Sequence, residues 1–307
     1  MPRLHSPSRW LISLLVMLCA ACAPAQAQTP AAGGKLNVVA TTTIVGDVVS
    51  NIGGDKIELT VLLPAGTDPH NFEAAPRDIA AVAEAQLLFA NGAGLEGFIQ
   101  RLIENAGGEA RVVPLSDGLD LITALPDEDD HGGFDPHVWL DPSMVGGWVP
   151  LVEQSLSELD PANAATYKEN ASRYLEALRQ LDSWIVEQVS QIPQYERKIV
   201  ADHLVFAYFA RHYGFEQTGA AVPAFSTLAE PSAQELAALE DKIRQSGVKA
   251  ILVGSTVNPA LSERIASDTG IQVVPIYSES LTPPGGPVAT YLDFMRYNVS
   301  AIVQARR

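Results

Sequence analysis

Cysteine is almost absent from this chain of 307 residues. The two cysteines, Cys19 and Cys22, both lie in the apolar segment at the N-terminus. The rest of the chain therefore has no disulfide and no thiolate that could bind a metal. A metal site after this segment would have to use nitrogen and oxygen atoms, which histidine, aspartate and glutamate supply.

Basic residues are also scarce. The chain carries 20 Lys and Arg against 36 Asp and Glu, and its formal net charge is −16. Nucleic-acid binding depends on a basic surface, so we expect no nucleic acid partner. The excess of acidic residues suits a protein that handles cations, although acidity by itself is common among proteins of many functions.

Long apolar runs are confined to the N-terminus. Residues 10–21 form an apolar run after two arginines, and the run is shorter than the roughly 20 residues that span a bilayer. We therefore predict an export signal over residues 1–27. Two alternatives remain open for its end: cleavage after the Ala-Gln-Ala of residues 25–27, or a lipobox-like end at which Cys22 would carry a lipid. The protein is accordingly expected to be exported, periplasmic or lipid-anchored on the outer side of the cytoplasmic membrane.

Beyond a flexible tether at residues 28–35, strand-like apolar runs alternate with helical patterns. This rhythm predicts an α/β fold with two lobes, at residues 36–159 and 194–307, each built on a mostly parallel sheet. The stretch from Gly107 to Asp117 is expected to be a loop. Strands are predicted at residues 36–40, 57–63, 87–90, 198–201, 249–253 and 271–276, and helices at residues 44–52, 77–85, 95–105, 144–159, 205–213, 232–245, 259–268 and 288–304.

One long helix is predicted to join the lobes, over residues 160–193. Asp160 suits its N-cap, Pro161 suits its first turn, and Pro193 ends it. No Gly or Pro intervenes before Ile192, and apolar residues recur at every third or fourth position. A helix of about 30 residues extends about 45 Å, which is enough to run from one lobe to the other.

Outside the acidic run at residues 127–131, histidine follows aspartate in three places. Asp-Pro-His ends at His70 and at His137, and Asp-His ends at His203. His70, His203 and Glu279 lie just past predicted strands, whereas His137 is expected to enter a short strand at residues 138–140. Ligands of open α/β sheets bind beyond the carboxyl ends of strands, so these four side chains are predicted to meet in the cleft between the lobes. Three imidazoles and one carboxylate make a tetrahedral site for a transition metal.

Other residues of the same types receive ordinary roles. His131 belongs to an acidic run at residues 127–131, which is expected to be a solvated loop. His212 follows Arg211 on a predicted helix and is expected to be structural. For Asp202 two roles remain open: a brace for its own loop, or an acceptor for the second ring nitrogen of a histidine.

A glycine motif raises a competing hypothesis. Residues 92–97 match G-x-G-x-x-G after a predicted strand, which is the context of dinucleotide-binding sites, and Asp117 follows at a suitable distance. The strand is the third of its lobe rather than the first, and an exported protein has little access to NAD. The glycines are therefore expected to serve close packing between strand and helix, and no nucleotide is predicted to bind.

Catalytic signatures are scarce, because H-E-x-x-H, G-x-S-x-G and the Walker A motif are all absent. A catalytic zinc keeps one position open for water, whereas four protein ligands would close the site. The sequence therefore favours a receptor that carries its metal over an enzyme. An exported zinc-dependent hydrolase and an adhesin whose metal serves stability are the alternatives from other classes.

Several segments resemble the solute-binding proteins of metal-importing ABC transporters, the zinc and manganese receptors of cluster A-I. The most specific is Asp-Pro-His-Val-Trp-Leu-Asp-Pro at residues 135–142, and the likeness covers nearly the whole chain after the signal. The remaining similar segments lie within residues 67–73, 76–78, 90–96, 202–214, 230–233 and 277–281.

The resemblance implies two α/β lobes joined by a rigid helix, with a metal ion between them. It carries the roles of metal ligands onto His70, His137, His203 and Glu279, and it implies that a permease and its ATPase receive the metal. A monomer is expected. The family usually has aspartate at the fourth position, so whether Glu279 binds through one oxygen or two remains open.

The third ligand position indicates zinc. Manganese receptors of this family tend to place a carboxylate there, and this chain has His203. Three imidazoles and one carboxylate form a softer donor set that favours zinc, as does the general order of divalent affinities. The predicted function is therefore high-affinity Zn²⁺ capture for import, with Mn²⁺ as the alternative ion.

Overall fold

The computed structural model describes residues 34–123 and 133–306. The predicted signal at residues 1–27, most of the tether and the acidic run with His131 lie outside these residues. From Lys35 onward the chain packs as one unit. None of the helices in the described ranges is long and apolar enough to cross a membrane.

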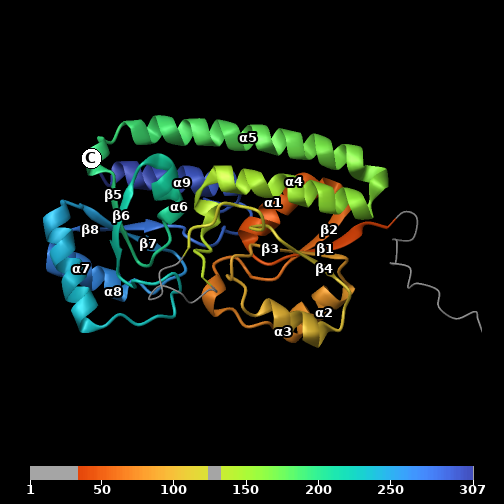
Figure 1. The fold of residues 1–307 in the computed structure, drawn as a ribbon, viewed down its shortest axis with the longest axis horizontal. Helices are drawn as coiled ribbons and strands as arrows, with labels where there is room; N and C mark the ends of the chain where they lie inside the picture. The colour runs from red at the N-terminus through yellow and green to blue at the C-terminus, as the bar shows by residue number, and fades with distance from the viewer. Residues whose placement is uncertain (1–33, 124–132, 307) are drawn as a thin grey trace, which may run out of the picture. The chain divides into compact units, whose positions relative to one another are not determined.

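The first lobe is built on a four-stranded parallel sheet with the strand order β2-β1-β3-β4. Every residue of β3 is buried, because helices cover both faces of the sheet. Helices α2 and α3 cover one face and α1 covers the other (Figure 1). The elements are β1 (Leu36–Ala40), α1 (Thr43–Gly53), β2 (Ile57–Val61), α2 (Pro76–Glu84), β3 (Leu87–Ala90), α3 (Ile99–Ala106) and β4 (Arg111–Pro114).

The second lobe repeats this plan with the strand order β6-β5-β7-β8, again fully parallel. Its central strand β7 is buried at all five positions. Helices α7 and α8 pack on one face of the sheet through a core of their own. The elements are β5 (Lys198–Ala201), α6 (Ala207–Tyr213), β6 (Glu216–Ala220), α7 (Ala233–Ser246), β7 (Ala250–Gly254), α8 (Ala260–Thr269) and β8 (Gln272–Ile276).

A layer of helices covers both sheets on the same side. The helix α5 (Ala164–Ser190) runs along both lobes, and it packs against α1, α4 (Pro142–Leu159) and α9 (Tyr291–Gln304), as Figure 1 shows. One hydrophobic core joins this layer to the inner faces of both sheets. The buried side of α5 has the three- and four-residue spacing expected of an amphipathic helix: Tyr167, Ala171, Tyr174, Leu178, Leu181, Ile185 and Val189.

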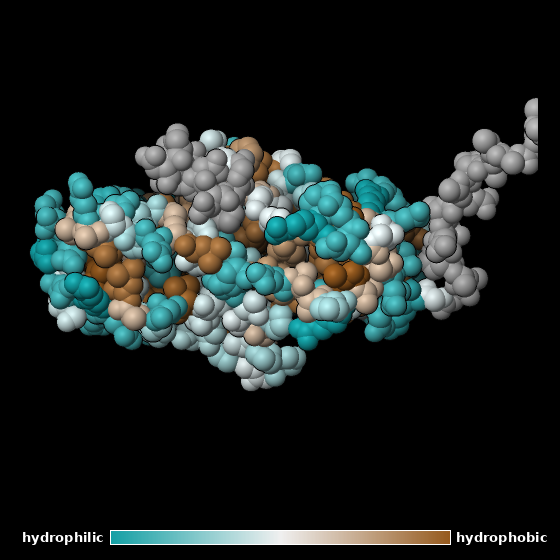
Figure 2. Space-filling model, turned by 90° about the horizontal axis from the view of Figure 1, so that it is seen from below, coloured by the Kyte–Doolittle hydropathy of each residue, from teal (hydrophilic) through white to brown (hydrophobic). Residues whose placement is uncertain are grey.

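The predicted fold class is confirmed: two α/β lobes with parallel sheets are joined by one long helix. Short 3₁₀ helices connect several elements. His70 lies on one of them, and His137 directly precedes another. They are η1 (Gly54–Lys56), η2 (Pro69–Asn71), η3 (Val138–Leu140), η4 (Pro161–Asn163) and η5 (Gln194–Glu196). On the face shown in Figure 2, the described residues form separate apolar patches among hydrophilic ones.

Several details of the prediction were wrong. The linking helix α5 begins at Ala164, after the 3₁₀ helix η4, so Asp160 is not its N-cap. Residues 138–140 form the 3₁₀ helix η3 rather than a strand, because the chain turns here between the loop of His137 and the N-cap of α4 at Asp141. The strands β4 and β6 were not predicted, since each is an edge strand with few fully buried side chains. Helix α3 begins at Ile99, four residues later than predicted.

The core layer generates a prediction about stability. Leu181 is fully buried on α5, whereas Val186 on the same helix is 51% exposed. We expect Leu181→Ala to lower the free energy of unfolding by about 2–5 kcal/mol, because it leaves a cavity in the core shared by both lobes. The control Val186→Ala should change it by no more than about 0.5 kcal/mol. Denaturant unfolding measures both, and equal losses would contradict this account of the core.

Candidate metal centre

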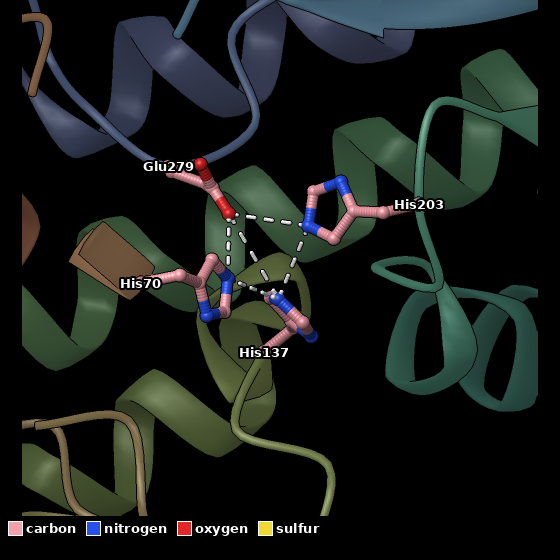
Figure 3. A group of neighbouring side chains, drawn as sticks. All are labelled: His70, His137, His203 and Glu279. Atoms are coloured by element: carbon pink, nitrogen blue, oxygen red, sulfur yellow. Dashed lines mark hydrogen bonds and ion pairs between the residues drawn. The ribbon is translucent and has the colours of Figure 1, made fainter. Parts of the chain in front are cut away.

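Three imidazoles and one carboxylate converge between the lobes (Figure 3). The Nε2 atom of His137 lies 3.3 Å from the Nε2 atoms of both His70 and His203. The Oε1 atom of Glu279 lies 2.9 Å from Nε2 of His70 and 3.1 Å from Nε2 of His203. All four candidate ligand atoms lie within 4.8 Å of one another. Ligands held about 2.0 Å from a tetrahedral zinc ion are about 3.3 Å apart, so this spacing fits such an ion.

Each lobe contributes two of the four side chains. His70 lies on η2 and His137 directly precedes η3, so both belong to the first lobe. His203 follows β5 and Glu279 follows β8, at the carboxyl ends of strands in the second sheet. The sequence predicted that these four side chains meet, and the structure places them side by side. Their role as metal ligands remains a prediction.

Two aspartates fix the orientation of two imidazoles. The carboxylate of Asp135 lies 2.7 Å from Nδ1 of His137, and the carboxylate of Asp202 lies 2.7 Å from Nδ1 of His203. An ionised carboxylate only accepts hydrogen bonds, so each Nδ1 carries a proton, and Nε2 is the ring nitrogen that each histidine can offer to a metal. This carboxylate–histidine arrangement is the usual outer support of a metal-binding histidine.

The aspartates also explain why aspartate precedes histidine in all three motifs. The backbone N–H groups of His70, His137 and His203 each donate to the carboxylate of the aspartate before them, at 2.7–2.9 Å. Each carboxylate thus closes a tight turn that aims its histidine inward. The open question about Asp202 is answered, because this residue both braces the loop and accepts from the ring.

The charges of the centre favour a bound cation. Burial lowers the pKa of His203, but the negative charges of Asp202 and Glu279 outweigh it and raise that pKa to about 10. Burial raises the pKa of Glu279, yet His203 and His70 more than offset this and hold it well below the usual range. The side chains of the four residues are at most 1% exposed. A metal ion entering here would meet an anionic, water-shielded set of donors, and protons would compete with it.

Hydrogen bonds across the lobes hold the centre in place, and the sequence did not reveal them. The indole of Trp139 donates to the backbone carbonyl of Ser278 at 2.7 Å, next to Glu279. Tyr291 donates to the carbonyl of Trp139 at 2.8 Å. The hydroxyl of Thr227, from the second lobe, donates to the carboxylate of Asp68 at 2.6 Å. These partners are far apart in the sequence, so no local pattern could have indicated them.

A cavity of about 670 Å³ opens beside the centre. Both lobes line it, and His70 is the only one of the four candidate ligands in its wall. Leu228, which is 60% exposed, also contributes to the wall. The wall also includes Pro69, Phe72, Phe98 and Arg101. The cavity therefore approaches the centre on the side that carries His70.

The glycine motif at residues 92–97 serves the local fold. Gly92 and Gly94 both have φ near +83°, which glycine adopts without strain. The buried carboxylate of Glu96 accepts the backbone N–H groups of Asn91 and Gly92 and the hydroxyl of Thr41. A phosphate would need such donors for itself, and an internal carboxylate already occupies them. This turn is consequently unsuited to a dinucleotide.

His212 lies away from the centre and links three elements. Its Nδ1 lies 2.9 Å from the carboxylate of Asp141, and its Nε2 lies 3.2 Å from that of Asp182. The hydrogen bond with Asp141 and the nearby negative charges raise its pKa, although partial burial acts against this. The structural role predicted for His212 agrees with these contacts. His131 lies outside the described residues.

Known proteins with this sequence pattern are metal receptors. A family model described as "Zinc-uptake complex component A periplasmic" matches residues 38–305. The manganese-binding lipoprotein MntA of Halalkalibacterium halodurans is 33% identical over 295 residues, which is 96% of each chain. The manganese ABC transporter substrate-binding lipoprotein PsaA of Streptococcus pneumoniae is 32% identical over 301 residues, again 96% of each chain.

Solved structures agree in fold. The periplasmic zinc binding protein TroA of Treponema pallidum superposes with a TM-score of 0.82 at 28% identity, over 89% of this chain and 99% of that one. The Mn-bound periplasmic metal binding protein of Candidatus Liberibacter asiaticus gives a TM-score of 0.79 at 25% identity, over 89% and 100%. The chain therefore belongs, as the sequence predicted, to the family of metal-binding receptors that work outside the cytoplasm, periplasmic or anchored to the outer face of the membrane, as substrate-binding components of ABC transporters.

Proposed function

We propose that this receptor binds Zn²⁺ through His70, His137, His203 and Glu279 and delivers it to a permease powered by an ATPase. The observation that carries the proposal is the cluster of three Nε2 atoms and one carboxylate oxygen within 4.8 Å, drawn from both lobes. We further propose that it acts as a monomer, with lobes at residues 36–159 and 194–307 and a linking segment at residues 160–193. Cleavage after residue 27 and lipidation at Cys22 remain the two predictions for its N-terminus.

Zinc is favoured over manganese by the chemistry of the donors. Three nitrogens and one oxygen suit a tetrahedral zinc ion, whereas manganese prefers more ligands and more oxygen among them. The zinc-binding structural neighbour TroA supports this choice. Manganese is the second candidate, because MntA and PsaA are named as manganese-binding proteins.

A competition experiment tests the choice of metal. Protein purified without added metal is analysed for its metal content, and the metal-free protein is then titrated with Zn²⁺ and Mn²⁺ in competition. We expect zinc in the purified protein and tighter zinc binding in the titration, since the donor set follows the general order of divalent affinities. Manganese binding as tightly as zinc, or tighter, would reject zinc as the cargo.

The ligand set is tested by thermal stability. A metal that binds only the folded state stabilises it by about 2.7 kcal/mol at 100 times its dissociation constant. Zinc should therefore raise the melting temperature of the wild type, and His70→Ala or His137→Ala should remove most of this increment. The control His212→Ala should retain it, because His212 contacts Asp141 and Asp182 rather than the centre. Full increments in the first two variants would contradict the assignment.

The outer support of His203 gives a further expectation. One oxygen of Asp202 accepts from the ring and backbone of His203, and the other accepts from the backbone N–H of Gly254. An asparagine can supply only one of these acceptors, so Asp202→Asn should weaken zinc binding about 10–100-fold. Asp241→Asn, at a 70% exposed side chain in the same lobe, is the matched control. Calorimetric titration of both variants measures the effect, and equal affinities would count against it.

A further inference from the structure

The strand β7 supplies no candidate ligand. The turn that follows it nevertheless contacts the carboxylates of Asp202 and Glu279. β7 lies between β5, which leads to His203, and β8, which leads to Glu279. A hydrogen bond of 3.2 Å from the backbone N–H of Val257 to the carbonyl of Gly254 closes the turn. From this turn, Gly254 donates its N–H to Asp202, and Thr256 donates its hydroxyl to Glu279.

The two oxygens of Glu279 have different surroundings. Oε1 points at the imidazoles, 2.9 Å from His70 and 3.1 Å from His203 (Figure 3). Oε2 accepts the hydroxyl of Thr256 at 2.9 Å. To bind a cation through both oxygens, the buried carboxylate would have to turn Oε2 toward the imidazoles, and the hydrogen bond from Thr256 opposes this turn. Glu279 therefore directs Oε1 at the imidazoles, while Oε2 accepts the hydrogen bond from Thr256.

We propose that Thr256 is a positioning residue that restricts Glu279 to one-oxygen coordination and thereby favours zinc over manganese. One oxygen and three imidazole nitrogens complete a set of four donors, which is the number a tetrahedral zinc ion takes. Manganese prefers six ligands, so it gains most from a second carboxylate oxygen. The inference rests on the proposed function, because it assumes that Glu279 is a ligand of the same centre.

Close packing fixes the position of this turn. A Cβ atom at Gly254 would lie 2.1 Å from the hydroxyl oxygen of Ser278, the residue before Glu279, and 3.2 Å from an oxygen of Asp202. Glycine at residue 254 thus lets the turn approach both carboxylates without a clash. Thr256 itself is only partly buried, so its side chain can be replaced with little disturbance of the core.

The test compares Thr256→Val, which keeps the shape and removes the hydroxyl, with Thr256→Ser, which keeps the hydroxyl. Competitive titration should show that Thr256→Val lowers the ratio of zinc to manganese affinity about tenfold or more, in the range typical of outer-sphere partners of metal sites. Thr256→Ser should retain the ratio of the wild type. Ser255→Ala, at the exposed neighbouring position in the same turn, should also retain it.

A spectroscopic measurement reports the coordination itself. Co²⁺ absorbs visible light strongly in a four-coordinate site and weakly in sites with more ligands, so the Co²⁺-loaded Thr256→Val protein should lose intensity relative to the wild type. Thr256→Ala serves as a second variant should the valine variant unfold. An unchanged metal ratio together with an unchanged cobalt spectrum would overturn the role of Thr256.

The outcomes for the two proposals are distinguishable. A wild type that prefers manganese rejects zinc as the cargo but leaves the cobalt comparison between wild type and Thr256→Val to decide the role of Thr256. A wild type that prefers zinc, with a Thr256→Val variant identical to it in ratio and spectrum, supports the proposed function and rejects this inference.

Discussion

The hydrogen bonds between an aspartate carboxylate and the histidine that follows it are the interactions on which the centre depends. At Asp135 and at Asp202, one carboxylate oxygen accepts from both the backbone N–H and the ring Nδ1 of the histidine. A single group therefore sets the loop conformation, the tautomer and the direction of Nε2. These contacts restrict the rotation of the His137 and His203 rings, so that both Nε2 atoms point toward the same centre.

These local turns can converge because both lobes pack against one layer of helices. The core around α5 is continuous from the first sheet to the second, and α4 and α9 belong to the same layer. Cross-lobe hydrogen bonds from Trp139 and Thr227 end beside Glu279 and His70, respectively. A preorganised set of donors loses little conformational entropy when a cation binds, which raises affinity.

Sequence reasoning worked where the signal was local. The spacing of apolar residues predicted α5. The repeated Asp-Pro-His with Asp-His identified three of the four converging side chains, and the position of Glu279 just past a predicted strand added the fourth. The errors arose where tertiary contacts overrode local preference. The apolar residues 138–140 resembled a strand but form η3, between the turn closed by Asp135 and the N-cap Asp141. The edge strands β4 and β6 have too few buried residues to be recognised. Thr256 and Trp139 could not be found, because the hydrogen bonds that define their roles join residues distant in the sequence.

The cavity beside His70 makes the two sides of the centre different, because it borders only one of the four candidate ligands. Of the four candidate ligands, His137, His203 and Glu279 are buried residues outside the cavity wall, whereas the residue His70 is partly exposed and belongs to that wall. A chelator or a donor group on the transporter that entered this cavity would approach the candidate centre from the side of His70. If the four side chains bind the cation, His70 is the ligand that faces the cavity, and the two imidazoles braced by Asp135 and Asp202 lie outside its wall.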